Sequence, residues 1–253
     1  MAYTNSSMVA YTKLSPNHSG QRTHSIDRIT PHCVVGQCTA EGLGDWFVKS
    51  STKASSNYGI DKDGRVGLYV EEKNRSWCSS SNANDQRAIT IECASDTSEP
   101  YAFRDVVYQK LIALCVDICK RNGKKKLLWF GDKDTTLNYS PKADEMVLTV
   151  HRWFAAKACP GQYLLDRQGA IAEEVTRRLQ EEIDTMTYEQ WKEYMARYQK
   201  ELAAQNATMP DLVADAVALG ISADGARPRD LMTREEGMVM ATAAVRAAKK
   251  DPA

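Results

Sequence analysis

The sequence predicts an α/β domain followed by a small all-helical module. Short apolar and β-branched runs, which are typical of strands, alternate with longer segments whose apolar residues recur at helical spacing. Strands interleaved with helices are typical of α/β domains. The pattern changes near residue 186, where polar and alanine-rich helical segments replace the strand-like runs. We therefore expect one domain at residues 1–185 and a helical module at residues 186–253.

The elements of the domain follow from local signals. The expected strands lie at residues 28–35, 88–93 and 127–130, the expected helices at 43–50, 103–121 and 162–183, and a hairpin at 56–70. The hairpin is predicted because Asp63-Gly64 separates two apolar runs and tolerates the positive φ of a tight turn. The longest helix is expected to end at Asn122-Gly123. The helical module is too short to bury much apolar surface alone, so it needs a partner or the main domain.

The composition is that of a globular protein and argues against several classes. Lysine plus arginine and aspartate plus glutamate both number 33, so the basic surface typical of nucleic-acid binding is not expected. No apolar stretch is long enough to cross a membrane. Residues 1–21 lack the apolar core of a signal peptide, so we expect the protein to be made in the cytoplasm. The seven cysteines, an odd number, argue against a disulfide framework.

One short segment carries the residue types of a metal centre. His151 and Cys159 are eight positions apart, and Lys157 lies between them. An imidazole and a thiolate can share a zinc ion, and His32, which follows Pro31 in a predicted strand, is the best third ligand. Three protein ligands leave one position for water, whose pKa zinc lowers to about 7. The alternative is that both histidines are buried without a metal and that Cys159 is a core thiol.

Three further side chains could take part in the chemistry. Lys157 could stabilise an oxyanion, or it could be an ordinary surface residue. Tyr58, in the hairpin, could donate its hydroxyl to a developing negative charge, although packing is the usual role of a strand tyrosine. Glu92 interrupts an apolar strand. Alternation favours a position toward solvent, whereas burial would raise its pKa and suit it to general base catalysis.

Four motifs occur in an order that resembles a known enzyme family. They are Pro31-His32-Cys33, the hairpin from Ser56 to Val66, the strand Ile89-Thr90-Ile91-Glu92, and His151 through Lys157-Ala158-Cys159-Pro160-Gly161. Together they resemble the type 2 N-acetylmuramoyl-L-alanine amidases, a zinc amidase family that shares its fold with peptidoglycan-recognition proteins. The resemblance covers residues 25–180, and the histidine eight residues before the Lys-Ala-Cys-Pro ending is specific to it.

The resemblance implies a mixed central sheet flanked by helices, with zinc as the cofactor and peptidoglycan as the substrate. The bond cut would join N-acetylmuramic acid to the L-alanine of the stem peptide. The implied zinc ligands are His32, His151 and Cys159, and the implied catalytic side chains are Lys157, Tyr58 and Glu92. Many members carry Trp-His-Ala-Gly after the hairpin, whereas this chain has Trp77-Cys78-Ser79-Ser80, so its substrate contacts should differ.

The resemblance suggests a phage or prophage endolysin of a Gram-positive host, which would act on the cell wall after release. The alternative is a non-catalytic peptidoglycan-binding protein on the same fold. Cys159 favours the enzyme, because binding-only relatives commonly lose a zinc ligand. A structural zinc would need a fourth ligand, and the side chain of Cys33, the obvious candidate, should point away from His32. The helical module could bind the wall or mediate homodimerisation.

Overall fold

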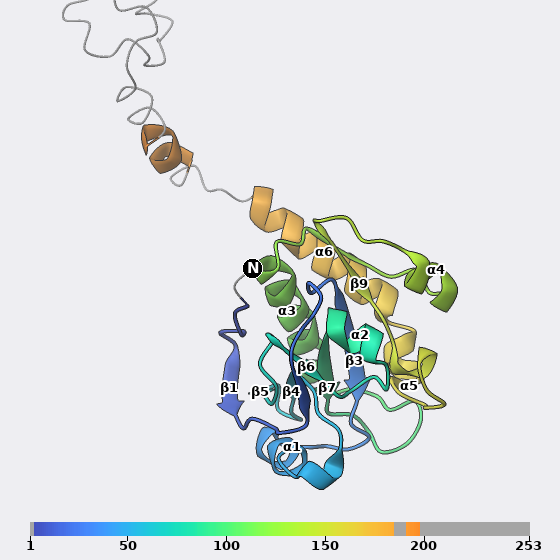
Figure 1. Ribbon diagram of the computed structural model, residues 1–253. Coiled ribbons are helices and arrows are strands. Elements are labelled where there is room, and N and C mark those ends of the chain that lie inside the picture. The colour runs from blue at the N-terminus through green and yellow to red at the C-terminus, as the bar shows by residue number, and fades with distance from the viewer. Residues whose placement is uncertain (1–2, 185–190, 198–253) are drawn as a thin grey trace, which may run out of the picture. The chain divides into compact units, whose positions relative to one another are not determined.

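The computed structural model describes residues 3–184 and 191–197 (Figure 1). The chain divides after Asp184 into two units, and the first contains the sheet and all the elements named below. Residues 191–197 are helical, within a segment expected to be a helix. Most of the predicted module at 186–253 lies outside the described residues, so its wall-binding or dimerising role stays a prediction.

Strands and helices alternate along residues 3–184. The strands are β1 (Val9–Thr12), β2 (His18–Gln21), β3 (Arg28–Cys33), β4 (Tyr58–Ile60), β5 (Val66–Leu68), β6 (Asn74–Ser76), β7 (Ala88–Cys93), β8 (Lys126–Leu128) and β9 (Glu145–Leu148). The α-helices are α1 (Ala40–Phe47), α2 (Asn82–Arg87), α3 (Asp105–Arg121), α4 (Lys133–Asn138), α5 (Gly161–Leu165) and α6 (Gln168–Asp184), and short 3-10 turns are η1 (Ser50–Thr52) and η2 (His151–Trp153).

The central sheet is mixed, as the resemblance implied. Its strand order is β1-β5-β4-β7-β3-β9-β8. The β4–β5 hairpin is antiparallel, and the other neighbouring strands of this sheet are parallel. β2 and β6 form a separate antiparallel pair. The predicted fold class, a mixed sheet flanked by helices, is therefore confirmed for the main domain.

One face of the sheet packs against α3 and α6, which lie side by side (Figure 1). The predicted apolar stripe of α3 is buried there: Val107, Leu111, Leu114 and Ile118 are inaccessible to solvent. These residues are three, four or seven positions apart, the spacing that puts side chains on one helix face. Each fully buried aliphatic side chain contributes about 1.5–3 kcal/mol by leaving water, so this layer anchors the sheet.

On the opposite face, α1 lies against the β4–β5 hairpin through two glycines. Leu43 and Phe47 of α1 pack with Tyr69, and all three are buried. A Cβ atom on Gly67 would lie 2.2 Å from the Tyr69 hydroxyl oxygen, and one on Gly59 would lie 2.8 Å from a methyl carbon of Leu43. The missing side chains therefore let α1 and Tyr69 lie directly on the sheet.

Some elements differ from the sequence prediction. The helix expected at 162–183 is two helices, α5 and α6. The short strands β1, β2, β6 and β9 were not predicted, because three or four residues carry too little periodicity. Within the described part of the chain, no helix is long and apolar enough to cross a membrane.

Candidate metal centre and active-site groove

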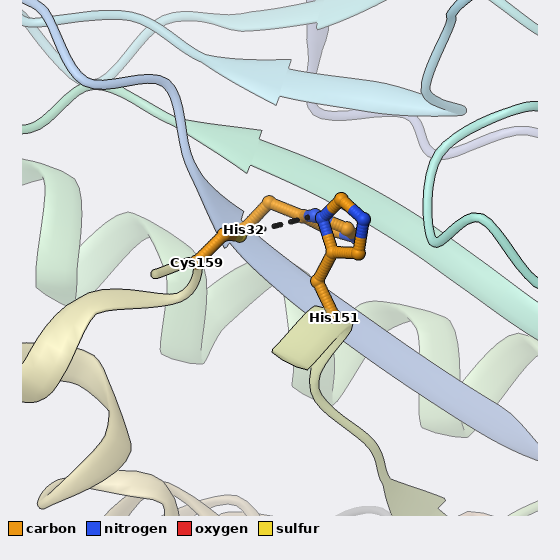
Figure 2. Close-up of side chains that lie close together, drawn as sticks. All are labelled: His32, His151 and Cys159. Carbon is orange, nitrogen blue, oxygen red and sulfur yellow. Dashed lines mark hydrogen bonds between the residues drawn. The ribbon is translucent and has the colours of Figure 1, made fainter. Parts of the chain in front are cut away.

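The three predicted zinc ligands converge from distant parts of the chain. His32 lies on β3, His151 begins η2, and Cys159 lies in the loop that follows (Figure 2). Each residue offers a ligand atom within 4.8 Å of the other two. The Cys159 Sγ is 3.3 Å from the His32 Nδ1, and the imidazole rings are 5.0 Å apart. This arrangement brings two imidazoles and a thiol together around one point.

Pro31 explains why His151 faces His32. The amides of Val147, in β9, and of Thr149, just after β9, donate to the carbonyls of Asp27, just before β3, and Ile29, so alternate residues along this stretch pair with each other. Pro31 is next in this series and has no N–H to continue the ladder. The chain therefore leaves β3 after Thr149 and turns into η2, which begins at His151.

Cys159 is held beside His151 by a closed loop. The Arg152 amide donates to the Cys159 carbonyl at 3.1 Å, and the Gly161 amide donates to the Ala158 carbonyl at 2.9 Å. The first bond ties the end of the 154–160 loop to η2. Backbone bonds therefore fix the thiol's position without help from the thiol itself.

The electrostatics of the two histidines suit a metal. Burial, followed by the neighbouring His151, holds the pKa of His32 well below its usual value. Burial, followed by the Lys157 ammonium, also lowers the pKa of His151. Both imidazoles are therefore favoured in the neutral form, which is the form that binds a metal.

One buried oxygen beside the ligands also lacks a partner among the described residues. The Glu92 Oε2 has no hydrogen bond. An unpartnered buried polar atom is costly, and a nearby ion is one of the groups that can account for it. Because two imidazoles and a thiol also converge on one point, the residues present fit a zinc ion held by His32, His151 and Cys159.

Glu92 lies in the groove beside the metal ligands. It pairs in register with His32, so both side chains leave the same face of the sheet. The Glu92 Oε1 is 4.0 Å from the His32 Nδ1, and its side chain is 19% exposed. Burial raises the pKa of Glu92 to about 7. The prediction that Glu92 faces solvent is therefore wrong. Glu92 lies inside the groove, where neighbouring residues cover most of its side chain.

Lys157 lines the same groove and is exposed. Its ammonium is close enough to lower the pKa of His151, as noted above. The side chain extends from the loop that carries Cys159, which places a positive charge at the groove. This position is compatible with the expected oxyanion role.

Tyr58 is the one predicted catalytic side chain that the structure places elsewhere. It pairs in register with Ile91 and lies on the helix-covered face, opposite Glu92. Its hydroxyl donates to Glu72 at 2.6 Å and accepts from the Ser6 amide at 2.8 Å. Tyr58 is fully buried and does not line the groove. Because strand residues alternate between faces, a shift of one position decides whether such a side chain reaches the site.

The groove around these residues has a volume of about 770 Å³, the size of a small-molecule or peptide site. Trp46, which is 52% exposed, and Trp77 line it, and Arg75 and Lys53 add positive charges to that of Lys157. Trp46 and Arg75 lie in no motif, so the sequence did not indicate them. Trp77 and Ser80 belong to the segment where different substrate contacts were expected, and the Ser80 Oγ lies 3.1 Å from the His151 Nε2.

Two other cysteines reach the groove. Cys33 lies at its edge, and its thiol is close enough to interact with Cys159. It packs in the helix-covered core and belongs to neither group of metal-binding side chains, as expected for a side chain that points away from His32. The Cys78 Sγ lies 3.6 Å from the Glu92 Oε1. Burial and the nearby Glu92 charge raise the pKa of Cys78 well above its usual value.

Solved structures share this fold. The Staphylococcus aureus hydrolase AmiA, solved with its ligand, is 12% identical with a TM-score of 0.50 over 69% of this chain and 84% of that chain. A mutant endolysin from Bacillus subtilis is 16% identical with a TM-score of 0.43, covering 65% of this chain and 97% of that chain. An AmpD derivative is 17% identical with a TM-score of 0.43, covering 71% and 99%.

The family comparison is more direct. A search of curated proteins finds no significant match. The family model described as Amidase_2, N-acetylmuramoyl-L-alanine amidase, matches residues 22–162, which is more than half of the chain. The matched segment includes both histidines, Cys159, Lys157 and Glu92. With the sheet, the groove and the convergent ligand atoms described above, this match establishes that the chain belongs to the N-acetylmuramoyl-L-alanine amidase family, Amidase_2.

Proposed function

We propose that this protein is a zinc-dependent amidase that hydrolyses the bond between N-acetylmuramic acid and L-alanine in peptidoglycan. The observation that carries the proposal is the convergence of His32, His151 and Cys159 at one side of the groove. Three protein ligands are typical of a catalytic zinc site, whereas a structural site normally has four. When bound, zinc supplies Lewis acidity toward the scissile carbonyl and makes water a stronger acid.

Glu92 is the proposed proton carrier. Burial raises its pKa to about 7 in the metal-free chain, toward the operating pH at which a general acid–base group is most effective. The carboxylate takes a proton from the attacking water, and the carboxylic acid returns it to the nitrogen of the leaving L-alanine. The unpartnered Oε2 is available for this transfer.

Lys157 is the proposed oxyanion partner. The tetrahedral species formed from the amide carries a negative oxygen, and a fixed positive charge at the groove stabilises that charge more than the neutral substrate. Tyr58 takes no step in this scheme, because its hydroxyl is bound in the core. The apolar walls at Trp46 and Trp77 would hold the muramoyl-peptide.

The proposed setting is the bacterial cell wall, which an endolysin of a phage or prophage would reach after release. Membership of the amidase family supports the wall as substrate.

The test is hydrolysis of purified cell walls, followed by new L-alanine amino termini and by loss of turbidity. We expect wild type with zinc to release termini. Cys159→Ser and EDTA-treated protein should release none. Glu92→Gln and Lys157→Met should each be slower by about 10²- to 10³-fold, the usual effect of removing an acid–base or oxyanion group.

Lys142→Met is the matched control, because Lys142 is an exposed lysine outside the groove. It should hydrolyse walls at the wild-type rate. Equal rates for Cys159→Ser and wild type would overturn the proposed ligand set. Wall binding without release by the zinc-loaded wild type would instead support the non-catalytic alternative.

A further inference from the structure

The groove contains a second group of metal-binding side chains, which shares His32 with the first. His32, Glu92 and Cys78 each offer a ligand atom within 4.8 Å of the other two. The Glu92 Oε1 connects them, at 4.0 Å from the His32 Nδ1 and 3.6 Å from the Cys78 Sγ. We propose that His32, Glu92 and Cys78 form an overlapping ligand set that binds a thiophilic divalent cation such as zinc, cobalt or cadmium.

The backbone around Cys78 fixes its thiol at this place. The Cys78 and Ser79 amides both donate to the Asp85 Oδ2 at 3.1 Å. Asp85 belongs to α2, so the turn after β6 is anchored to a helix. The side chain that results points to a carboxylate rather than into the apolar core. A thiolate, an imidazole and a carboxylate together are a typical donor set for zinc and related ions.

One further observation supports a cation here. The Glu92 Oε2 is buried and without a hydrogen-bond partner in the described chain. An ion bound by His32, Glu92 and Cys78 would draw Glu92 into coordination and would displace the thiol proton of Cys78 to solvent. The unpaired carboxylate would then be neutralised.

Because both ligand sets use the same nitrogen of His32, only one of them can hold an ion at a time. The His32 Nδ1 is the atom that faces both the Cys159 Sγ, at 3.3 Å, and the Glu92 Oε1, at 4.0 Å. One nitrogen lone pair binds one ion, so both sets cannot use this atom together. An ion in the second set would leave His151 and Cys159 incomplete and would occupy Glu92. If the protein has the proposed amidase activity, on which this inference rests, excess metal bound by the second ligand set would therefore inhibit that activity.

The experiment is titration of metal-free protein with Co²⁺, read by thiolate-to-cobalt charge-transfer absorption. Cys159→Ser removes the first thiolate. We expect this variant to retain a thiolate–cobalt band from Cys78, and the double variant Cys159→Ser/Cys78→Ser to lose it. The Co²⁺ affinity of the double variant should be about 100-fold lower than that of Cys159→Ser. Even the loss of a residue that only hydrogen-bonds a metal ligand lowers metal affinity about 10- to 100-fold.

Cys159→Ser/Cys38→Ser is the matched control, since Cys38 belongs to neither ligand group, and it should keep the band. Cys159→Ser/Glu92→Gln gives a second test and should weaken Co²⁺ binding without touching a thiol. A band that survives Cys78→Ser would assign the remaining thiolate to Cys33 and overturn the proposal. So would a Cys159→Ser variant that shows no band.

The outcome is separable from that of the proposed function. If zinc-loaded wild type fails to cleave walls while the Cys159→Ser band depends on Cys78, the amidase proposal fails and the second ligand set stands. If wild type cleaves walls and Cys159→Ser shows no band, the amidase proposal stands and the second ligand set fails.

Discussion

Glu92 shows how one side chain's position changes its chemistry. On an exposed strand it would be an ordinary carboxylate, but here the groove removes most of its water. Desolvation disfavours the charged form, and the Cys78 thiol offsets only part of that cost by hydrogen bonding. The raised pKa is therefore a property of the fold around residue 92 and has a consequence for stability.

Without metal, the contribution of Glu92 to stability should fall as the pH rises from about 4.5 to 7, whereas the lowered pKa values of His32 and His151 act in the opposite direction. The folded chain keeps the Glu92 proton up to a pKa of about 7, whereas the unfolded chain loses it near the ordinary value of 4.5. The contribution of the neutral carboxyl is present below pH 4.5 and is lost as the pH passes 7. It amounts to at most about 3 kcal/mol. Denaturant unfolding in EDTA at several pH values measures it.

Glu92→Gln is neutral at every pH and lacks this contribution, so the difference in stability between wild type and the variant should change across this pH range. Glu173→Gln, at an exposed position on α6, is the control and should unfold with the wild-type pH profile. Identical profiles for Glu92→Gln and wild type would show that residue 92 does not carry the shifted proton.

At the scale of elements, the β4–β5 hairpin sets the height of α1 above the sheet. Because Gly59 and Gly67 have no side chains, Tyr69 and Leu43 fill the space over them. The same helix supplies Trp46 to the groove wall. A change at these glycines should therefore affect both stability and the shape of the groove.

Gly67→Ala should destabilise the protein by about 1–3 kcal/mol, the usual cost of overpacking a core. The new methyl group would meet the hydroxyl and ring of Tyr69, which is buried and donates a hydrogen bond to the Ala40 carbonyl. Thermal and denaturant unfolding measure the effect. Gly36→Ala is the matched control, because no atom lies within 4 Å of its Cβ position, and it should be close to neutral. Equal stability of the two variants would contradict this packing.

At the scale of the whole domain, the metal ligands connect segments that are far apart in the chain. His32 and Cys159 are 127 positions apart, and they come from a central strand and a late loop. A bound ion would tie these segments together in the native state only. Ligands that bind the folded chain stabilise it by mass action.

Zinc should therefore raise the unfolding temperature of the wild type and EDTA should lower it. At a zinc concentration about 100 times the dissociation constant, the stabilisation is about 2.7 kcal/mol. Cys159→Ser/Cys78→Ser should lose most of this effect, while Cys38→Ser should retain it. A wild-type unfolding temperature that is the same with zinc and with EDTA would refute a bound ion in the folded domain.

The sequence by itself determined the α/β class, the strand at 88–93, the hairpin and the three candidate zinc ligands. These features depend on local chemistry: side-chain alternation, the Asp63-Gly64 turn and a short His–Lys–Cys segment. Tertiary structure decided what local pattern cannot, namely which face of the sheet each side chain occupies. It placed Glu92 in the groove, buried Tyr58 on the helix-covered face of the sheet, and brought Cys78 beside Glu92. The physical reason is that strand register and covering helices, rather than residue type, determine which groups share a site.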